Sequence, residues 1–180
     1  MSCIRNRNTH IWYSSPCTGG CPFNLGINWA IGDDTRNKIL AHWKVHDLVW
    51  TGFKRVAAHA HHHGCTISIE WAHRCAYHRL KSTRQLVSKY GLEYRMVSGC
   101  SVRLMSENPK TKGQLLCKAW GIWSNNPEIL QRLIHLRCNS LHTRVACEGR
   151  DTEHSGNYTD PLAKIIHLAF RAHWDSTPQK

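Results

Sequence analysis

The stretch HIWYSSPCTGGCPFN, residues 10–24, organises the rest of the chain. Residues 11–13 are strand formers, and Pro16 and two glycines follow them abruptly. Strand formers that stop at proline and glycine indicate a sheet edge that opens onto a loop. Because ligand sites of open α/β sheets lie at the carboxyl ends of strands, Cys17 in this loop is a candidate functional residue. The alternative is a small buried side chain in a tight turn, since free cysteines are often buried.

The composition is that of a basic globular protein. The 180 residues include 24 Lys and Arg against 12 Asp and Glu, a formal net charge of +12, and 41% of them are hydrophobic. This length suits one domain with its own core, which we expect over residues 1–175, followed by a tail at 176–180. The positive charge favours nucleic acid as a partner, although a solvated basic surface has the same composition.

The sequence shows no sign of export or membrane insertion. Residues 1–8 are polar and basic, and no window is long and apolar enough to span a membrane. We therefore expect an intracellular protein, nuclear if the source is eukaryotic, whose 9 cysteines stay reduced and are available for catalysis or metal binding. Nothing in the pattern indicates an oligomeric state.

Predicted strands and helices alternate along the chain. The predicted strands are residues 11–13, 65–70, 93–97 and 119–123. The predicted helices are residues 35–61, with Asp33 and Asp34 as caps, 82–90, a helix opened by Asn126 and Pro127, and 162–173. Alternation of this kind is typical of an α/β fold in which helices cover a mostly parallel sheet.

A Cys/His-rich loop is predicted over residues 137–158. Cys138, His142 and Cys147 lie within ten residues there, and His154 is a candidate fourth ligand. Thiolate and imidazole ligands at short spacing suit zinc. The spacing C-x3-H-x4-C is not that of a standard zinc finger, so scattered loop cysteines are the alternative.

A cytidine deaminase is a rival interpretation of Pro16 and Cys17. That zinc chemistry requires a Pro-Cys-x-x-Cys step and an upstream His-x-Glu. Here three residues separate Cys17 from Cys21, and no His-x-Glu precedes them. We therefore set this interpretation aside.

Two stretches resemble motifs of the C5-cytosine DNA methyltransferases. The loop SSPCTGGCPFN resembles the proline-cysteine loop of that family, and TISIEW, residues 66–71, resembles the next family strand, which ends on a glutamate. The resemblance implies a Rossmann-like, methyltransferase-type sheet with flanking helices. It also implies that Cys17 is the nucleophile and Glu70 the acid that binds the base. Arg103 is the candidate for an arginine that holds the thiolate or the base edge.

The chemistry of that family explains the pairing of a cysteine with a glutamate. A thiolate that adds to C6 of cytosine makes C5 nucleophilic, and a carboxylic acid at N3 supplies a proton as charge develops. The base has to be flipped out of the duplex to reach such a pocket. The alternative for Glu70 is a strand-end carboxylate paired with a basic residue.

The resemblance carries further implications for ligands. It implies base contacts from Ser15, Pro16, Thr18, Gly19, Gly20 and Trp71, and DNA rather than RNA as the partner. The cofactor of the family is S-adenosylmethionine, which binds at a glycine-rich turn usually upstream of the proline-cysteine loop. Only sixteen residues precede Cys17, and none forms such a turn. The chain thus resembles the catalytic half of the enzyme, with an incomplete sheet.

A second resemblance points to a degenerate copy. The chain is similar to an uncharacterised domain of mobile-element reading frames that has a Pro-Cys-Thr-Gly-Gly loop, a Glu-Trp-Pro step and a Cys/His-rich stretch. Ala72, Ala119 and Ala146 stand where that pattern has proline, and Arg144 where it has histidine. The alternative function is therefore a non-catalytic nucleic-acid-binding domain, in which Trp12, Trp71 and Trp174 could stack on bases.

Overall fold

A computed structural model describes Ile4 and residues 9–176. Of the predicted tail, only Ser176 lies within the described residues, and it ends the last helix. The strands are β1 (His10–Ser14), β2 (Thr66–Ala72), β3 (Glu93–Ser98), β4 (Leu116–Cys117), β5 (Ala119–Ser124) and β6 (Val145–Ala146). The α-helices are α1 (Pro22–Gly26), α2 (Asp33–His62), α3 (Lys81–Lys89), α4 (Pro127–Leu133), α5 (Arg150–His154) and α6 (Asp160–Ser176). Four short 3₁₀ helices are η1 (Thr18–Gly20), η2 (Asn28–Ala30), η3 (Ala76–Arg79) and η4 (Gly99–Val102).

The chain divides into two compact units. The first contains the chain up to Glu93 together with residues 123–125, and the second contains residues 94–122 and 126–180. The expected single domain over residues 1–175 stays a prediction, because such a division does not show how many folding units the chain has.

The four main strands have the order β1-β2-β5-β3. In the first unit β1 pairs in parallel with β2, in a register that runs from His10 opposite Thr66 to Ser14 opposite Glu70. The sheet as a whole is mixed and mostly antiparallel. The α/β prediction is therefore confirmed, whereas a mostly parallel, Rossmann-like sheet is not. Strand direction depends on how the chain returns to the sheet, which hydrophobic periodicity does not report.

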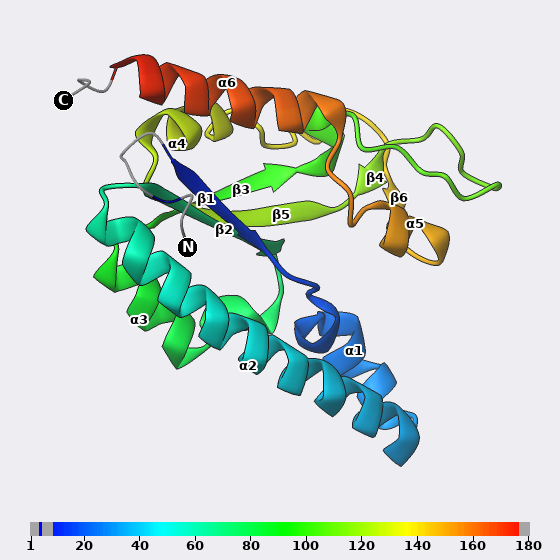
Figure 1. The fold of residues 1–180 in the computed structure, drawn as a ribbon. Helices are drawn as coiled ribbons and strands as arrows, with labels where there is room; N and C mark the ends of the chain where they lie inside the picture. The colour runs from blue at the N-terminus through cyan, green and yellow to red at the C-terminus, as the bar shows by residue number, and fades with distance from the viewer. Residues whose placement is uncertain (1–3, 5–8, 177–180) are drawn as a thin grey trace. The chain divides into compact units, whose positions relative to one another are not determined.

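Helix α2 packs on β1 and β2 because one of its faces is apolar. Its buried positions recur every three, four or seven residues, as one helical face requires: Ile39, His46, Trp50, Phe53, Ala57 and Ala60. Figure 1 shows α2 and α3 on the same side of β1 and β2. The predicted helix is confirmed, but its N-cap is Gly32, and Asp33 and Asp34 occupy the first turn, where carboxylates favour the helix dipole.

In the second unit, α4 and α6 pack side by side (Figure 1). Asn126 caps α4 as predicted, because its side-chain oxygen accepts a hydrogen bond from the backbone N–H of Ile129 at 3.1 Å, and Pro127 follows it. In the described part of the chain, no helix is long and apolar enough to cross a membrane.

The Cys/His-rich segment is more ordered than the predicted loop, since it contains β6 and α5. Asp151 of α5 is buried and accepts hydrogen bonds from Ser106 Oγ at 2.6 Å and from the backbone N–H of Glu107 at 2.7 Å. A buried carboxylate needs such partners. These long-range bonds, which sequence periodicity does not reveal, fix α5.

His78 is buried in the first unit between two hydrogen bonds. Its Nδ1 accepts from the indole N–H of Trp123 at 3.0 Å, and because an indole only donates, Nε2 carries the proton and donates to Ala72 O at 3.1 Å. Burial lowers the pKa of His78 to about 4 from its ordinary value of 6.5. The folded protein therefore keeps this ring neutral where the unfolded chain protonates it.

We predict that His78 makes the folded state less stable in mild acid. Between pH 6.5 and 4, His78 is protonated in the unfolded chain but stays neutral in the folded chain. The free energy of unfolding should therefore fall as pH falls, by up to about 1.4 kcal/mol per pH unit. Urea unfolding across this range should show a smaller slope in His78→Gln than in the wild type. His62→Gln, at an exposed position, is the control. An unchanged slope in His78→Gln would contradict the prediction.

Candidate active site

The structure brings the Cys17 loop, residues 15–21, to the same sheet edge as Glu70. Ser14 at the end of β1 lies opposite Glu70 in the parallel ladder, and its hydroxyl donates a hydrogen bond to Glu70 Oε2 at 2.8 Å. Glu70 is only 5% exposed, whereas Cys17, three residues beyond Ser14, is half-buried. A partly accessible thiol thus follows the strand that holds a buried carboxyl group in place.

Two contacts attach the loop to the rest of the first unit, and a third closes a turn within it. The indole N–H of Trp71 donates to Ser15 Oγ at 3.0 Å, and the thiol of Cys75 approaches Cys17 O at 3.9 Å. Within the loop, Gly20 N donates to Cys17 O at 3.0 Å and closes a turn. The carbonyl oxygen of Cys17 therefore has one partner within the loop and one outside it.

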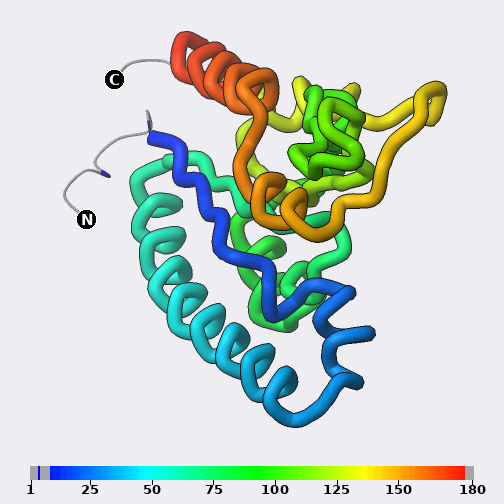
Figure 2. The backbone as a smooth tube through the Cα atoms, turned by 90° about the vertical axis from the view of Figure 1, so that its right-hand side faces the viewer, coloured from blue at the N-terminus to red at the C-terminus, as the bar shows by residue number. Residues whose placement is uncertain are grey.

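An aromatic cluster lies beneath the loop and fills the space between α2 and the sheet. Its members are Tyr13, Trp43, His46, Trp50, Phe53, Trp71 and Tyr77. His46 stacks on Tyr77 with ring centroids 3.6 Å apart, and Tyr13 stacks on Phe53 at 4.2 Å. Figure 2 shows the loop and α1 beside the end of the tube where α2 begins. The packed rings of the cluster thus support the loop.

The close packing of the loop on these rings requires glycine at positions 19 and 20. A Cβ on Gly19 would lie 2.6 Å from the hydroxyl of Tyr77, and a Cβ on Gly20 would lie 2.7 Å from the sulfur of Cys75. Both neighbours are buried, so neither can move aside without disturbing the core. The two glycines therefore serve loop packing.

The groups beneath the loop are uncharged near neutral pH. Burial raises the pKa of the Cys75 thiol to about 12, although a backbone hydrogen bond at Tyr77 lowers it in part. Burial also raises the pKa of Tyr77 and lowers the pKa of His46. Cys75 is thus an inert structural thiol, whereas Cys17 is the more accessible of the two.

The other predicted base-contact residues divide into accessible and buried ones. Pro16 and Thr18 are exposed beside Cys17, and Ser15 is half-buried. Trp71 was expected to contact bases; it is 1% exposed and packs within the aromatic cluster, and its contact with a base stays a prediction. An alternating strand places every second side chain inside, and both faces of β2 are covered here.

Arg103 belongs to the second unit. It is exposed, follows η4, and has a left-handed backbone with φ 59°. The structure does not place it relative to Cys17, so its role stays a prediction.

We tested the fit of S-adenosylmethionine on the glycines of the first strand's loop. The cofactor turn of the family needs glycines because the ligand approaches the backbone where a Cβ atom would otherwise lie. Gly19 and Gly20 instead face Tyr77 and Cys75, and no room is left there. Gly19 and Gly20 therefore do not form such a cofactor turn, and no methyl-transfer step follows from them.

A separate group of metal-ligand atoms lies in the second unit. Cys100, Cys138 and His142 place their sulfur and nitrogen atoms within 4.8 Å of one another. Two of the predicted metal ligands thus come together, with Cys100 as an unpredicted third. Its only sequence signal is a cysteine in a Gly-Cys-Ser turn after a strand, and such a signal does not identify a distant partner.

The two other predicted ligands have different partners. Cys147 lies 3.2 Å from Ser155 Oγ and 3.4 Å from Asp151 O, and both belong to or follow α5. His154 ends α5. Neither residue joins the group of Cys100, Cys138 and His142.

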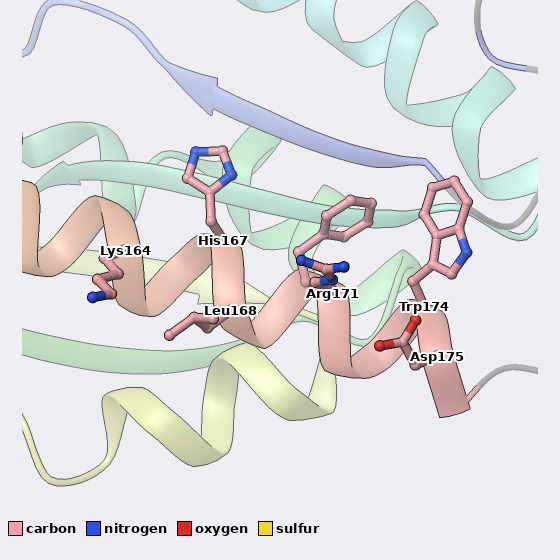
Figure 3. Close-up of a pocket in the computed structure, with 7 residues that line it drawn as sticks. Lys164, His167, Leu168, Arg171, Trp174 and Asp175 are labelled. Atoms are coloured by element: carbon pink, nitrogen blue, oxygen red, sulfur yellow. The ribbon is translucent and has the colours of Figure 1, made fainter.

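Two exposed surfaces carry grouped basic side chains. In the first unit, the lining of an α3 basic surface contains Leu86 and Tyr90 but no carboxylate; its cations are Lys54, Arg79, Lys81, Arg84 and Lys89. In the second unit Lys164, His167 and Arg171 project from α6 near Trp174 (Figure 3). Asp175 also lies there, so the surface on α6 is less uniformly positive.

We predict that Gly20→Ala destabilises the protein by about 1–3 kcal/mol, because its new methyl group would overlap Cys75 and Tyr77. Gly52 is the matched control: it lies within α2 with nothing near its Cβ position, so Gly52→Ala should stabilise by up to about 1 kcal/mol. Urea denaturation measures both changes. Equal stability of Gly20→Ala and the wild type would show that the loop is not packed as described.

Comparison of the chain with family models, with curated proteins and with solved structures gives no match.

Proposed function

We propose that the first unit binds a flipped cytosine of DNA and adds the Cys17 thiolate to it, in the manner of a C5-cytosine methyltransferase. The observation that carries this proposal is the register of β1 and β2, which sets Glu70 beside the strand end that leads into the Cys17 loop. A half-buried thiol and a buried carboxyl group at one sheet edge are the two groups that this addition needs.

The proposed step is an addition that reverses without a further reactant. The thiolate sulfur of Cys17 forms a bond to C6 of cytosine, and the C5–C6 double-bond electrons shift toward C4. The C4–N3 electrons move onto N3, which takes the proton of the Glu70 carboxylic acid. The product is an enamine whose C5 is nucleophilic. Ser14 holds the carboxyl group through its hydrogen bond to Oε2.

The α3 basic surface supports nucleic acid as the substrate. Cys75 and Tyr77 lie beneath the Cys17 loop, and the chain continues from them through η3 to Arg79 and Lys81. Arg79 follows Tyr77, which contacts the loop, by two residues. Grouped Lys and Arg side chains without interleaved acids neutralise phosphates and release counterions. An intracellular and, in a eukaryote, nuclear location belongs to this proposal.

The second candidate is a DNA-binding domain without catalysis. The α3 basic surface favours it, because this surface needs neither Cys17 nor a cofactor. The two candidates differ in one measurable respect, since only the first forms a bond between protein and base.

We predict that Cys17 forms a covalent adduct with DNA that contains 2-pyrimidinone, a cytosine analogue with an electrophilic C6. This probe needs no methyl donor. A protein–DNA species that survives denaturation should form with the wild type and be lost in Cys17→Ser. Denaturing gel electrophoresis and mass spectrometry of the labelled peptide measure it.

Cys21→Ser is the matched control, because Cys21 is a half-buried thiol in the same loop. It should keep the adduct. Glu70→Gln should slow adduct formation by at least about tenfold, since an amide does not supply the proton. An adduct that persists in Cys17→Ser, or no adduct with any protein, would reject the catalytic proposal and leave the binding one.

We predict that the α3 basic surface contributes to DNA binding through phosphates. In a double variant of Lys81→Gln and Arg84→Gln, log Kd should depend less steeply on log salt, by up to about 2 in slope. Fluorescence anisotropy with a labelled duplex measures this. Lys110→Gln with Lys112→Gln, an equal charge change on an exposed loop of the second unit, is the control. Equal slopes in the two double variants would contradict the role of α3.

A further inference from the structure

We propose that Cys100, Cys138 and His142 bind a zinc ion that fastens residues 137–144 to the end of β3 and η4. This site does not involve Cys17 or Glu70, so it stands independently of the function proposed above. It rests on three geometric observations about these residues.

The first observation is that the backbone brings two distant cysteines together. Leu136 O accepts hydrogen bonds from Ser98 N at 2.8 Å and from Ser101 Oγ at 2.9 Å. The hydroxyl of Ser98 in turn accepts from Cys138 N at 3.0 Å. These bonds hold the segment before Cys138 against the turn that contains Cys100. Hydrogen bonds of the chain itself thus bring the two thiols close together, without a bound ion.

The second observation is a turn that prepares the sulfur of Cys138. The backbone N–H of Ser140 donates to Cys138 Sγ at 3.2 Å, and Ser140 has a left-handed φ of 61°. Asn139 Oδ1 accepts from Leu141 N at 3.1 Å and tightens the same turn. An N–H that points at sulfur favours the thiolate, which is the form that binds metal.

The third observation is the spacing of the ligand atoms. Cys138 Sγ lies 3.7 Å from His142 Nε2, and all three ligand atoms lie within 4.8 Å of one another. A tetrahedral zinc ion with bonds of about 2.3 Å to sulfur and 2.0 Å to nitrogen separates such ligands by about 3.6–3.8 Å. Small side-chain rotations therefore complete the site.

Two soft thiolates and an imidazole select zinc over magnesium or calcium, which prefer oxygen. Among the residues that the structure describes, the group has three members, so the fourth position falls to water or to an outside ligand. His142 is exposed, which leaves the ion accessible from solvent.

The test is elemental analysis of protein purified under reducing conditions without a metal column. We expect about one equivalent of zinc in the wild type and less than about 0.2 in Cys138→Ser. After removal of zinc, cobalt should give the thiolate charge-transfer and d–d bands of a tetrahedral site. Because His142 is exposed, His142→Ala should fold, keep its circular dichroism spectrum and still lose tight zinc binding.

Two cysteines outside the group serve as controls, since Cys117→Ser and Cys147→Ser should each keep the ion. A wild type that neither contains zinc nor gives the cobalt spectrum would overturn the proposal. Zinc loss in Cys147→Ser equal to that in Cys138→Ser would overturn this ligand set. A Cys100–Cys138 disulfide in place of the ion, seen as two missing thiols, would overturn it as well.

Discussion

The parallel ladder between β1 and β2 is the constraint on which the candidate active site depends. Because Ser14 lies opposite Glu70, the residues that follow β1 emerge beside a buried carboxyl group. A shift of the register by one residue would turn Glu70 to the other face of the sheet and separate it from Ser14. The hydrogen bond of 2.8 Å between Ser14 and Glu70 marks the register. The position of the Cys17 loop beside Glu70 thus depends on backbone pairing rather than on local loop sequence.

The aromatic cluster holds the loop that follows this strand pairing in place. Large rings bury much apolar surface at a low cost in side-chain entropy, and stacked or edge-to-face pairs add to that stability. Tyr77 stands at the centre, since it stacks on His46 and lies against Gly19. The rings therefore hold the Cys17 backbone while its thiol stays partly accessible.

The two units hold the two candidate sites separately. The first contains the thiol, the carboxyl group and the α3 basic surface on which the proposed binding of a DNA base and its phosphates rests. The second holds the group of Cys100, Cys138 and His142, whose preparation by backbone bonds resembles that of a structural metal site. A metal there would stabilise a segment that has little secondary structure, just as metals stabilise other loop-rich regions.

Local sequence determined much of this protein. Strand formers before Pro16, the apolar face of α2 and the Asn126–Pro127 cap predicted β1, α2 and α4, because these signals act within a few residues. Tertiary structure alone decided the rest. Three features depend on residues far apart in the chain: the antiparallel strand pairings, the burial of Trp71 and the approach of Cys100 to Cys138. Such contacts depend on how the helices and strands pack in three dimensions. Hydrophobic periodicity and short motif spacing do not predict that packing.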